Sequence, residues 1–155
     1  MTKSTFDELF LSDKDKSENG VERMIGVNAK DEDVVLIIAE AGSERHSKAQ
    51  RKYSKQLELT RKRPKAREKV QAQIIAESIL VGWRGVLDEN KNEIEPTVEN
   101  KIEFLMKYNK LFYAVLDVAN DSENYRAISI DDDEEDTESI EIEDMVTPEE
   151  DTEKN

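Results

Sequence analysis

Few residues of this chain have the chemistry that catalysis requires. His46 is the only histidine, cysteine is absent, and the chain has neither a G-x-S-x-G nucleophile motif nor a phosphate-binding glycine loop. The densest group of carboxylates is an acidic C-terminal stretch, where hydrated carboxylates do not acquire the separated pKa values of an acid–base pair. We therefore predict a protein that is not an enzyme, with no catalytic residue, no cofactor and His46 as a solvated helix residue.

One turn has the residue types of a calcium site. Positions 1, 3, 5 and 12 of an EF-hand loop are occupied by oxygen-bearing side chains, namely Asp88, Asn90, Asn92 and Glu99. Glu93, however, replaces the glycine of the sharp turn, and Pro96 falls inside the loop. Asp and Asn are also common in ordinary turns. We predict a polar turn and no metal site.

A basic stretch is the only nucleic-acid signal. Residues 45–69 carry eleven Lys or Arg against two Glu, a net of +9, with Arg61, Lys62 and Arg63 near the centre. Such a patch can neutralise phosphates, but it lacks a pattern of interleaved aromatic residues and a recognisable nucleic-acid-binding motif. Three interpretations stay open: a solvated helix face, a docking surface for a partner or for the chain's own acidic residues, and nucleic-acid binding, which has the weakest support.

The apolar pattern predicts an α+β fold, mostly α. Residues 21–27 and 34–39, separated by a polar turn, are rich in β-branched residues and predict a two-strand hairpin. About four helices follow. We expect the first to begin after an N-cap at Ser43 and to end at Pro64, the second to span about 65–82, and the last two to be capped by Thr97 and Asn109.

Charge divides the chain. Residues 128–155 contain fourteen Asp or Glu and one Lys, a net of −13 within a total of −14, so residues 1–127 are nearly neutral. We predict a flexible N-terminal arm over 1–19, one domain over 20–127 and a disordered acidic tail over 128–155. The sequence lacks a signal-peptide core and any run of ~20 apolar residues, which predicts a soluble intracellular protein.

The stretch around the single tryptophan carries a resemblance. Together with the two-strand start, it resembles the tail assembly chaperones of long-tailed bacteriophages over residues 20–127. The residues concerned are Ala76-Glu77-x-x-x-x-Gly82-Trp83-Arg84-Gly85-Val86-x-Asp88, Ile94-x-Pro96-Thr97-x-Glu99-Asn100, Leu105, Leu111 and Ala119-x-Asp121. This chain departs from the pattern at Lys91-Asn92, where many relatives have a turn glycine, and at Asn109, where relatives often have proline. Asparagine tolerates the left-handed conformation that such a turn needs.

The resemblance implies a function and partners. Proteins of this family act in the host bacterial cytoplasm, bind the tape-measure protein and keep it soluble until tail tube subunits polymerise around it. Relatives also occur in a frameshift-extended form that recruits the tail tube protein, and self-association is a further family expectation. Two other readings are a structural virion protein of the tail or head–tail junction and a nucleic-acid-binding regulator.

Four aromatic residues are the expected anchors for a client helix. Buried aromatics dominate interface energies, so we expect partner contacts at Trp83, Phe104, Phe112 and Tyr113, and at the cations Arg61, Lys62 and Arg63. For Trp83 and Phe112, a place in the ordinary hydrophobic core is the competing interpretation.

Overall fold

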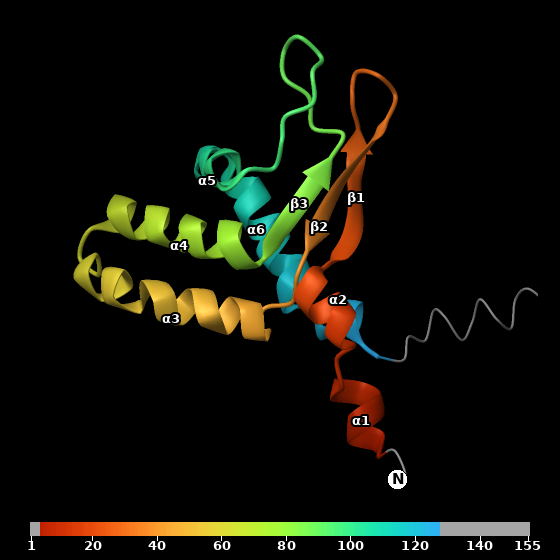
Figure 1. Cartoon of the computed structure of the whole chain (residues 1–155), viewed down its shortest axis with the longest axis vertical. Helices are drawn as coiled ribbons and strands as arrows, with labels where there is room; N and C mark the ends of the chain where they lie inside the picture. Colours follow the sequence, from red (N-terminus) through yellow and green to blue (C-terminus); the bar gives the residue numbers. More distant parts are fainter. Residues whose placement is uncertain (1–3, 128–155) are drawn as a thin grey trace, which may run out of the picture. The chain divides into compact units, whose positions relative to one another are not determined.

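The structure is a computed structural model that describes residues 4–127 (Figure 1). Residues 12–125 form one compact unit, and the described residues 4–11 and 126–127 belong to a second. The elements in chain order are α1 (Thr5–Phe10), α2 (Lys14–Asn19), β1 (Val21–Val27), β2 (Asp33–Ile38), α3 (Glu44–Leu59), α4 (Pro64–Ser78), β3 (Leu80–Arg84), α5 (Val98–Lys107), α6 (Asn109–Asn120) and the 3₁₀ helix η1 (Ser122–Tyr125). The predicted α+β class is confirmed. The predicted acidic tail, 128–155, lies outside the described residues.

The predicted N-terminal arm is largely helical. Helix α1 begins with a capping box, in which Ser4 and Asp7 each accept a hydrogen bond from the other's backbone N–H. Helix α2 belongs to the main unit, where the Ser17 carbonyl accepts a hydrogen bond from the Glu40 N–H at 2.9 Å. This contact between backbone groups joins α2 to the segment after β2 and leaves no apolar signal in the sequence.

The predicted hairpin of β1 and β2 is confirmed, but the sheet has a third strand. The strand order is β1-β2-β3, antiparallel throughout, and Trp83 of β3 is opposite Leu36 of β2. The sequence predicted a helix as far as Gly82, whereas α4 ends at Ser78. Pairing with the exposed edge of β2 outweighs the helical pattern, since an isolated two-strand hairpin is only marginally stable.

A buried lysine marks the point where helix α4 gives way to strand β3. The Lys101 side chain on α5 is only 7% exposed. Its Nζ donates hydrogen bonds to the carbonyls of Ala76 at 3.3 Å and Val81 at 2.9 Å. Burial, with a smaller contribution from Arg45, lowers the Lys101 pKa. The ammonium thereby satisfies carbonyls that a continued helix would have paired internally.

The helix starts test the predicted caps. Ser43 accepts from the His46 N–H and Thr97 from the Asn100 N–H, so both predicted N-caps are confirmed. The Asn109 cap is wrong: Asn109 is the first helical residue, and Tyr108 holds the cap position without a side-chain hydrogen bond.

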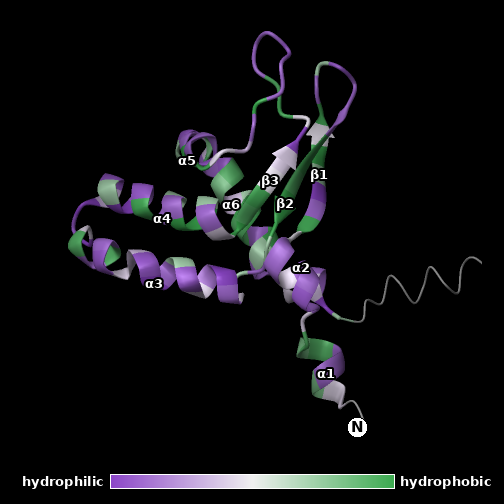
Figure 2. Cartoon of the chain, viewed as in Figure 1, coloured by the Kyte–Doolittle hydropathy of each residue, from purple (hydrophilic) through white to green (hydrophobic). Residues whose placement is uncertain are grey.

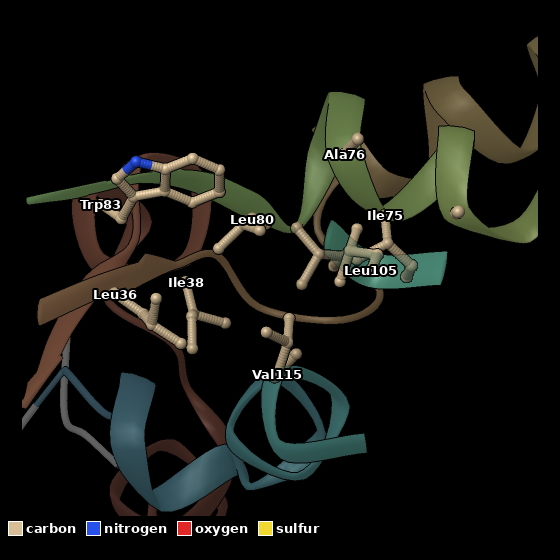
Figure 3. Close-up of a cluster of buried hydrophobic side chains, with 11 residues drawn as sticks. Leu36, Ile38, Ile75, Ala76, Leu80, Trp83, Leu105 and Val115 are labelled. Atoms are coloured by element: carbon tan, nitrogen blue, oxygen red, sulfur yellow. The ribbon is translucent and has the colours of Figure 1, made fainter. Parts of the chain in front are cut away.

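The hydrophobic core lies where the sheet meets helices α4, α5 and α6. Figure 3 shows Leu36, Ile38, Leu80 and Trp83 of the strands facing this interior, and Val115 of α6 closing it. Tyr125 at the end of η1 is fully buried, and its hydroxyl donates to the Ile38 carbonyl at 2.9 Å. The sheet is therefore anchored at the end where β2 finishes.

Helices α3 and α4 form a hairpin with a smaller core of its own. Ala49 and Tyr53 of α3 pack against Val70 and Ile74 of α4. The rest of α3 is mainly hydrophilic (Figure 2). Because its apolar stripe is narrow, this hairpin depends on polar contacts as well as on packing.

One carboxylate provides a test of this helical hairpin. Glu77 accepts hydrogen bonds from the Tyr53 hydroxyl and from Lys52 Nζ, the latter at 2.9 Å. Burial by itself would raise the Glu77 pKa, but the bonds from Tyr53 and Lys52 outweigh it and lower the pKa. Because the Glu77 pKa is lower in the folded state, the ionised carboxylate stabilises the fold at any pH above the unfolded-state pKa near 4.5. This stabilisation is lost as the pH falls through the lower pKa of the folded state. Glu77→Gln should reduce the unfolding free energy by about 1 kcal/mol at neutral pH.

Urea denaturation at neutral and acidic pH measures this effect. The gap between wild type and Glu77→Gln should narrow below pH ~4. Glu58→Gln is the matched control, because Glu58 makes only an exposed 3.6 Å ion pair with Arg61. An equal effect of both substitutions, or a pH-independent gap, would contradict the assigned role of Glu77.

Candidate functional site

The four predicted aromatic anchors divide between two surfaces. Trp83 and Phe104 lie together, with ring centroids 5.8 Å apart, and Tyr108 stacks on Phe104 at 6.2 Å. Phe112 and Tyr113 instead contact each other edge to face at 5.6 Å. The first three residues line one groove, and Phe112 and Tyr113 line two hollows elsewhere. The single aromatic site expected from the sequence is thus two sites.

Trp83 is both a core residue and a wall of the larger groove. It is 7% exposed, and its Nε1 donates to the Ile94 carbonyl at 2.7 Å. This bond holds the loop before α5 against strand β3. The competing core interpretation is therefore confirmed for Trp83, which is also among the residues that line the groove.

The larger groove is an open cavity of about 930 Å³. It lies over the end of the sheet face whose other end, at Ile38 and Leu80, is covered by the core helices. Strands, loops and helices all contribute its apolar lining: Ile25, Ala29, Val34, Leu36, Trp83, Val86, Leu87, Ile94, Phe104, Tyr108 and Leu111. Its volume is at the upper end of the range of ligand pockets, about 300–1,000 Å³.

Two exposed residues of this groove were not predicted from the sequence. Tyr108 is 49% exposed and Ile25 is 53% exposed. Tyr108 follows Phe104 by four residues, a spacing that places both on one side of a helix and could have revealed it. Ile25 lies at a bulge where the β1 register shifts between Met24 and Gly26, and a bulge is invisible to an alternating pattern.

The groove mouth is held in shape by side-chain contacts between loops. Asn28 in the β1–β2 turn donates through Nδ2 to the Gly85 carbonyl at 2.8 Å. Asp88 Oδ1 accepts from the backbone N–H groups of Asn90 and Asn92 at 2.8 and 2.9 Å. Asp88, the first residue of the loop that was compared with an EF-hand, therefore hydrogen-bonds to the backbone of its own turn. Among residues 4–127, the structure contains no cluster of three or more potential metal-ligating His, Cys, Asp or Glu side chains.

The left-handed residue in this loop is Lys91, with φ of +66°, rather than Asn92 as the sequence suggested. Lysine is strained there, whereas glycine is not. Lys91→Gly should therefore raise the unfolding free energy by about 0.5–1 kcal/mol, the left-handed penalty less the entropy gained by the unfolded chain. Thermal and urea unfolding of Lys91→Gly and Asn92→Gly provide the comparison, and stabilisation by Asn92→Gly alone would refute the assignment.

The second surface lies where α3, α4 and α6 meet. Phe112 and Tyr113 line hollows of about 390 and 150 Å³, and Tyr113 is 63% exposed. His46 borders the larger hollow and accepts a hydrogen bond from the Gly42 N–H through Nδ1 at 2.9 Å. Burial lowers the His46 pKa. The prediction of a solvated His46 is therefore wrong: the imidazole is half-buried and holds the start of α3.

The predicted cations lie apart from both surfaces. Arg61, Lys62 and Arg63 occupy the exposed turn between α3 and α4 and line none of the grooves described above. Arg61 faces Glu58 at 3.6 Å. The residues predicted from the sequence to contact a partner therefore lie in three separate places in the fold.

The fold and groove define a small α+β domain with an open apolar groove. Residues 39–136, more than half of the chain, match the family model of the YdaY prophage protein. The chain belongs to this family and is therefore phage-derived. The curated proteins and the solved structures gave no significant match. Within residues 4–127, every helix is too short or too polar to cross a membrane.

Proposed function

We propose that this protein is a non-enzymatic phage tail assembly chaperone of the host cytoplasm. It binds the tape-measure protein and keeps it soluble while tail tube subunits assemble around it. Membership of a prophage family supports a role in phage biology. The resemblance described above supports the tail-assembly role.

The observation that carries the proposal is the open apolar groove beside Trp83. Phe104 is partly buried there, and Tyr108 is 49% exposed. A groove of this kind can receive the apolar face of an amphipathic helix, which would otherwise aggregate in water. Binding is non-covalent and reversible, so assembling tube subunits can displace the chaperone.

The residues of the family resemblance also build this groove. Trp83 to Gly85 form the end of β3 and its exit, and Thr97 caps α5 through the Asn100 N–H. Helix α5 then presents Phe104 to Trp83. The resembling residues therefore position one wall of the candidate client site.

Co-expression with the tape-measure protein of the same genome tests the proposal. We expect a soluble complex that is recovered by pull-down and is lost in the double variant Phe104→Ala/Tyr108→Ala. Tyr113→Ala is the matched control, because its ring belongs to the other surface. Failure of the native chain to bind or solubilise the tape-measure protein would overturn the proposed function. Finding the chain in purified particles by mass spectrometry would favour a structural virion protein instead.

A further inference from the structure

The groove beside Trp83 combines an apolar floor with an acidic border. Asp88, Glu89 and Glu103 line it, against the single cation Lys107, giving a net charge of −2. Glu89 and Glu103 are exposed. The groove lining therefore favours positive charge near an apolar ligand.

The two loops at the groove mouth add further negative charge near the groove. The β1–β2 turn together with the first residue of β2, residues 28–33, carries three carboxylates and one lysine, and residues 85–97 carry four carboxylates and one lysine. The bond from Asn28 to the Gly85 carbonyl ties these loops together, so the acidic border is held in place before a ligand arrives. Fixed charges of this kind discriminate between partners more than they add affinity.

The helical hairpin of the same unit has the opposite charge. Residues 45–69, in α3 and the first part of α4, carry a net of +9, and nearly all of these cations are exposed. A cationic ligand is repelled there and attracted to the groove mouth. The charge distribution therefore selects the groove near Trp83 over the hollows beside α3.

The shape of the groove selects the conformation of the ligand. Leu36 and Val34 of the central strand β2 line it, so the ligand lies on a sheet face rather than along an unpaired strand edge. Phe104 of α5 and Tyr108, the residue that follows α5, also line it. A site between a sheet face and a helix suits an amphipathic helix that inserts its apolar stripe.

We infer that this groove receives an amphipathic helix that carries Lys or Arg beside its apolar stripe, with the cations facing Glu89, Glu103 and the acidic loops. The inference rests on the proposed function, because it specifies the segment of the client that the chaperone selects. It also predicts that the client's basic amphipathic segments, rather than its acidic ones, are bound first.

The test uses two helical peptides of about 18 residues, without tryptophan, that share one leucine stripe and differ only in flanking lysines or glutamates. Trp83 is the only tryptophan of the chain and lines the groove, so its fluorescence reports binding directly. We expect the lysine peptide to bind about tenfold or more tighter at ~50 mM salt, and the difference to shrink at ~500 mM.

Charge reversal supplies the matched variants. Glu89→Lys/Glu103→Lys should invert the peptide preference, whereas Asp117→Lys/Glu123→Lys makes the same net charge change at exposed sites outside the groove and should leave it within about twofold. Thermal unfolding of both double variants checks that the fold is kept. Equal binding of the two peptides, or equal effects of the two double variants, would overturn the inference.

A second copy of this chain is the competing occupant. The last residue of α3, Leu59, is 68% exposed and precedes the turn that carries Arg61, Lys62 and Arg63. If the protein alone self-associates, and Leu59→Asp abolishes association and frees the groove for peptide, the groove belongs to a neighbouring copy and the inference is overturned. Rescue of the tape-measure protein without peptide discrimination would leave the proposed function standing and refute only the inference. Preference for the lysine peptide without rescue of the tape-measure protein would support the groove's charge selectivity and refute the proposed function.

Discussion

Replacing Gly85 by alanine is expected to lower the free energy of unfolding by about 3 kcal/mol or more. Gly85 has φ of +82°, a conformation that costs an alanine about 1–2 kcal/mol. A Cβ at this position would also lie 2.3 Å from the carbonyl oxygen of Asp33, which is backbone and cannot move without shifting strand β2. The conformational penalty and the steric clash are separate contributions, so we expect their free energies to add.

Two other glycines separate these contributions. Gly42 has φ of +88° but open space around its Cβ position, so Gly42→Ala should show the conformational penalty alone. Gly26 has open space and no positive φ, so Gly26→Ala should change stability by less than about 0.5 kcal/mol. Urea denaturation of all three variants should give the order Gly85, Gly42, Gly26. If the Gly85 variant is no less stable than the Gly42 variant, the predicted clash between a Cβ at position 85 and the Asp33 carbonyl oxygen does not occur.

Truncation of Trp83 to alanine is expected to cost about 3–5 kcal/mol. Trp83 is 7% exposed, and its indole contacts the Phe104 ring and donates to the Ile94 carbonyl. Its removal leaves a cavity between β3 and α5 and frees the loop that Ile94 anchors. Because the same ring lines the groove, the variant should also fail to bind a client helix.

Trp83→Phe distinguishes packing from hydrogen bonding. Phenylalanine keeps an aromatic ring but lacks the N–H, so it leaves the Ile94 carbonyl without this donor and should lose about 1–3 kcal/mol. Thermal unfolding and peptide binding together test both variants. If Trp83→Ala is as stable as Trp83→Phe, the ring does not support the groove wall, and its assigned structural role is wrong.

The assignment to a phage family and the choice of aromatic anchor residues rest on different kinds of sequence evidence. The order of motif residues around Trp83 indicated a phage protein, and the family match agrees at that level. The aromatic set, however, came from residue type alone. Residue type identifies side chains able to anchor a partner, but which of them share a surface depends on how α5 and α6 diverge at Tyr108.

The sequence by itself determined the hairpin of β1 and β2, the helices that start after Ser43 and Thr97, and the α+β class. These are local features, because apolar period, capping side chains and turn residues act over a few positions. Tertiary structure decided where α4 ends. Residues 79–82 continue a helical pattern, yet Leu80 pairs with Ile38 and Lys101 satisfies the freed carbonyls, and both partners are distant in sequence. The groove beside Trp83 exists because that helix became a strand, so only the long-range contacts could create it.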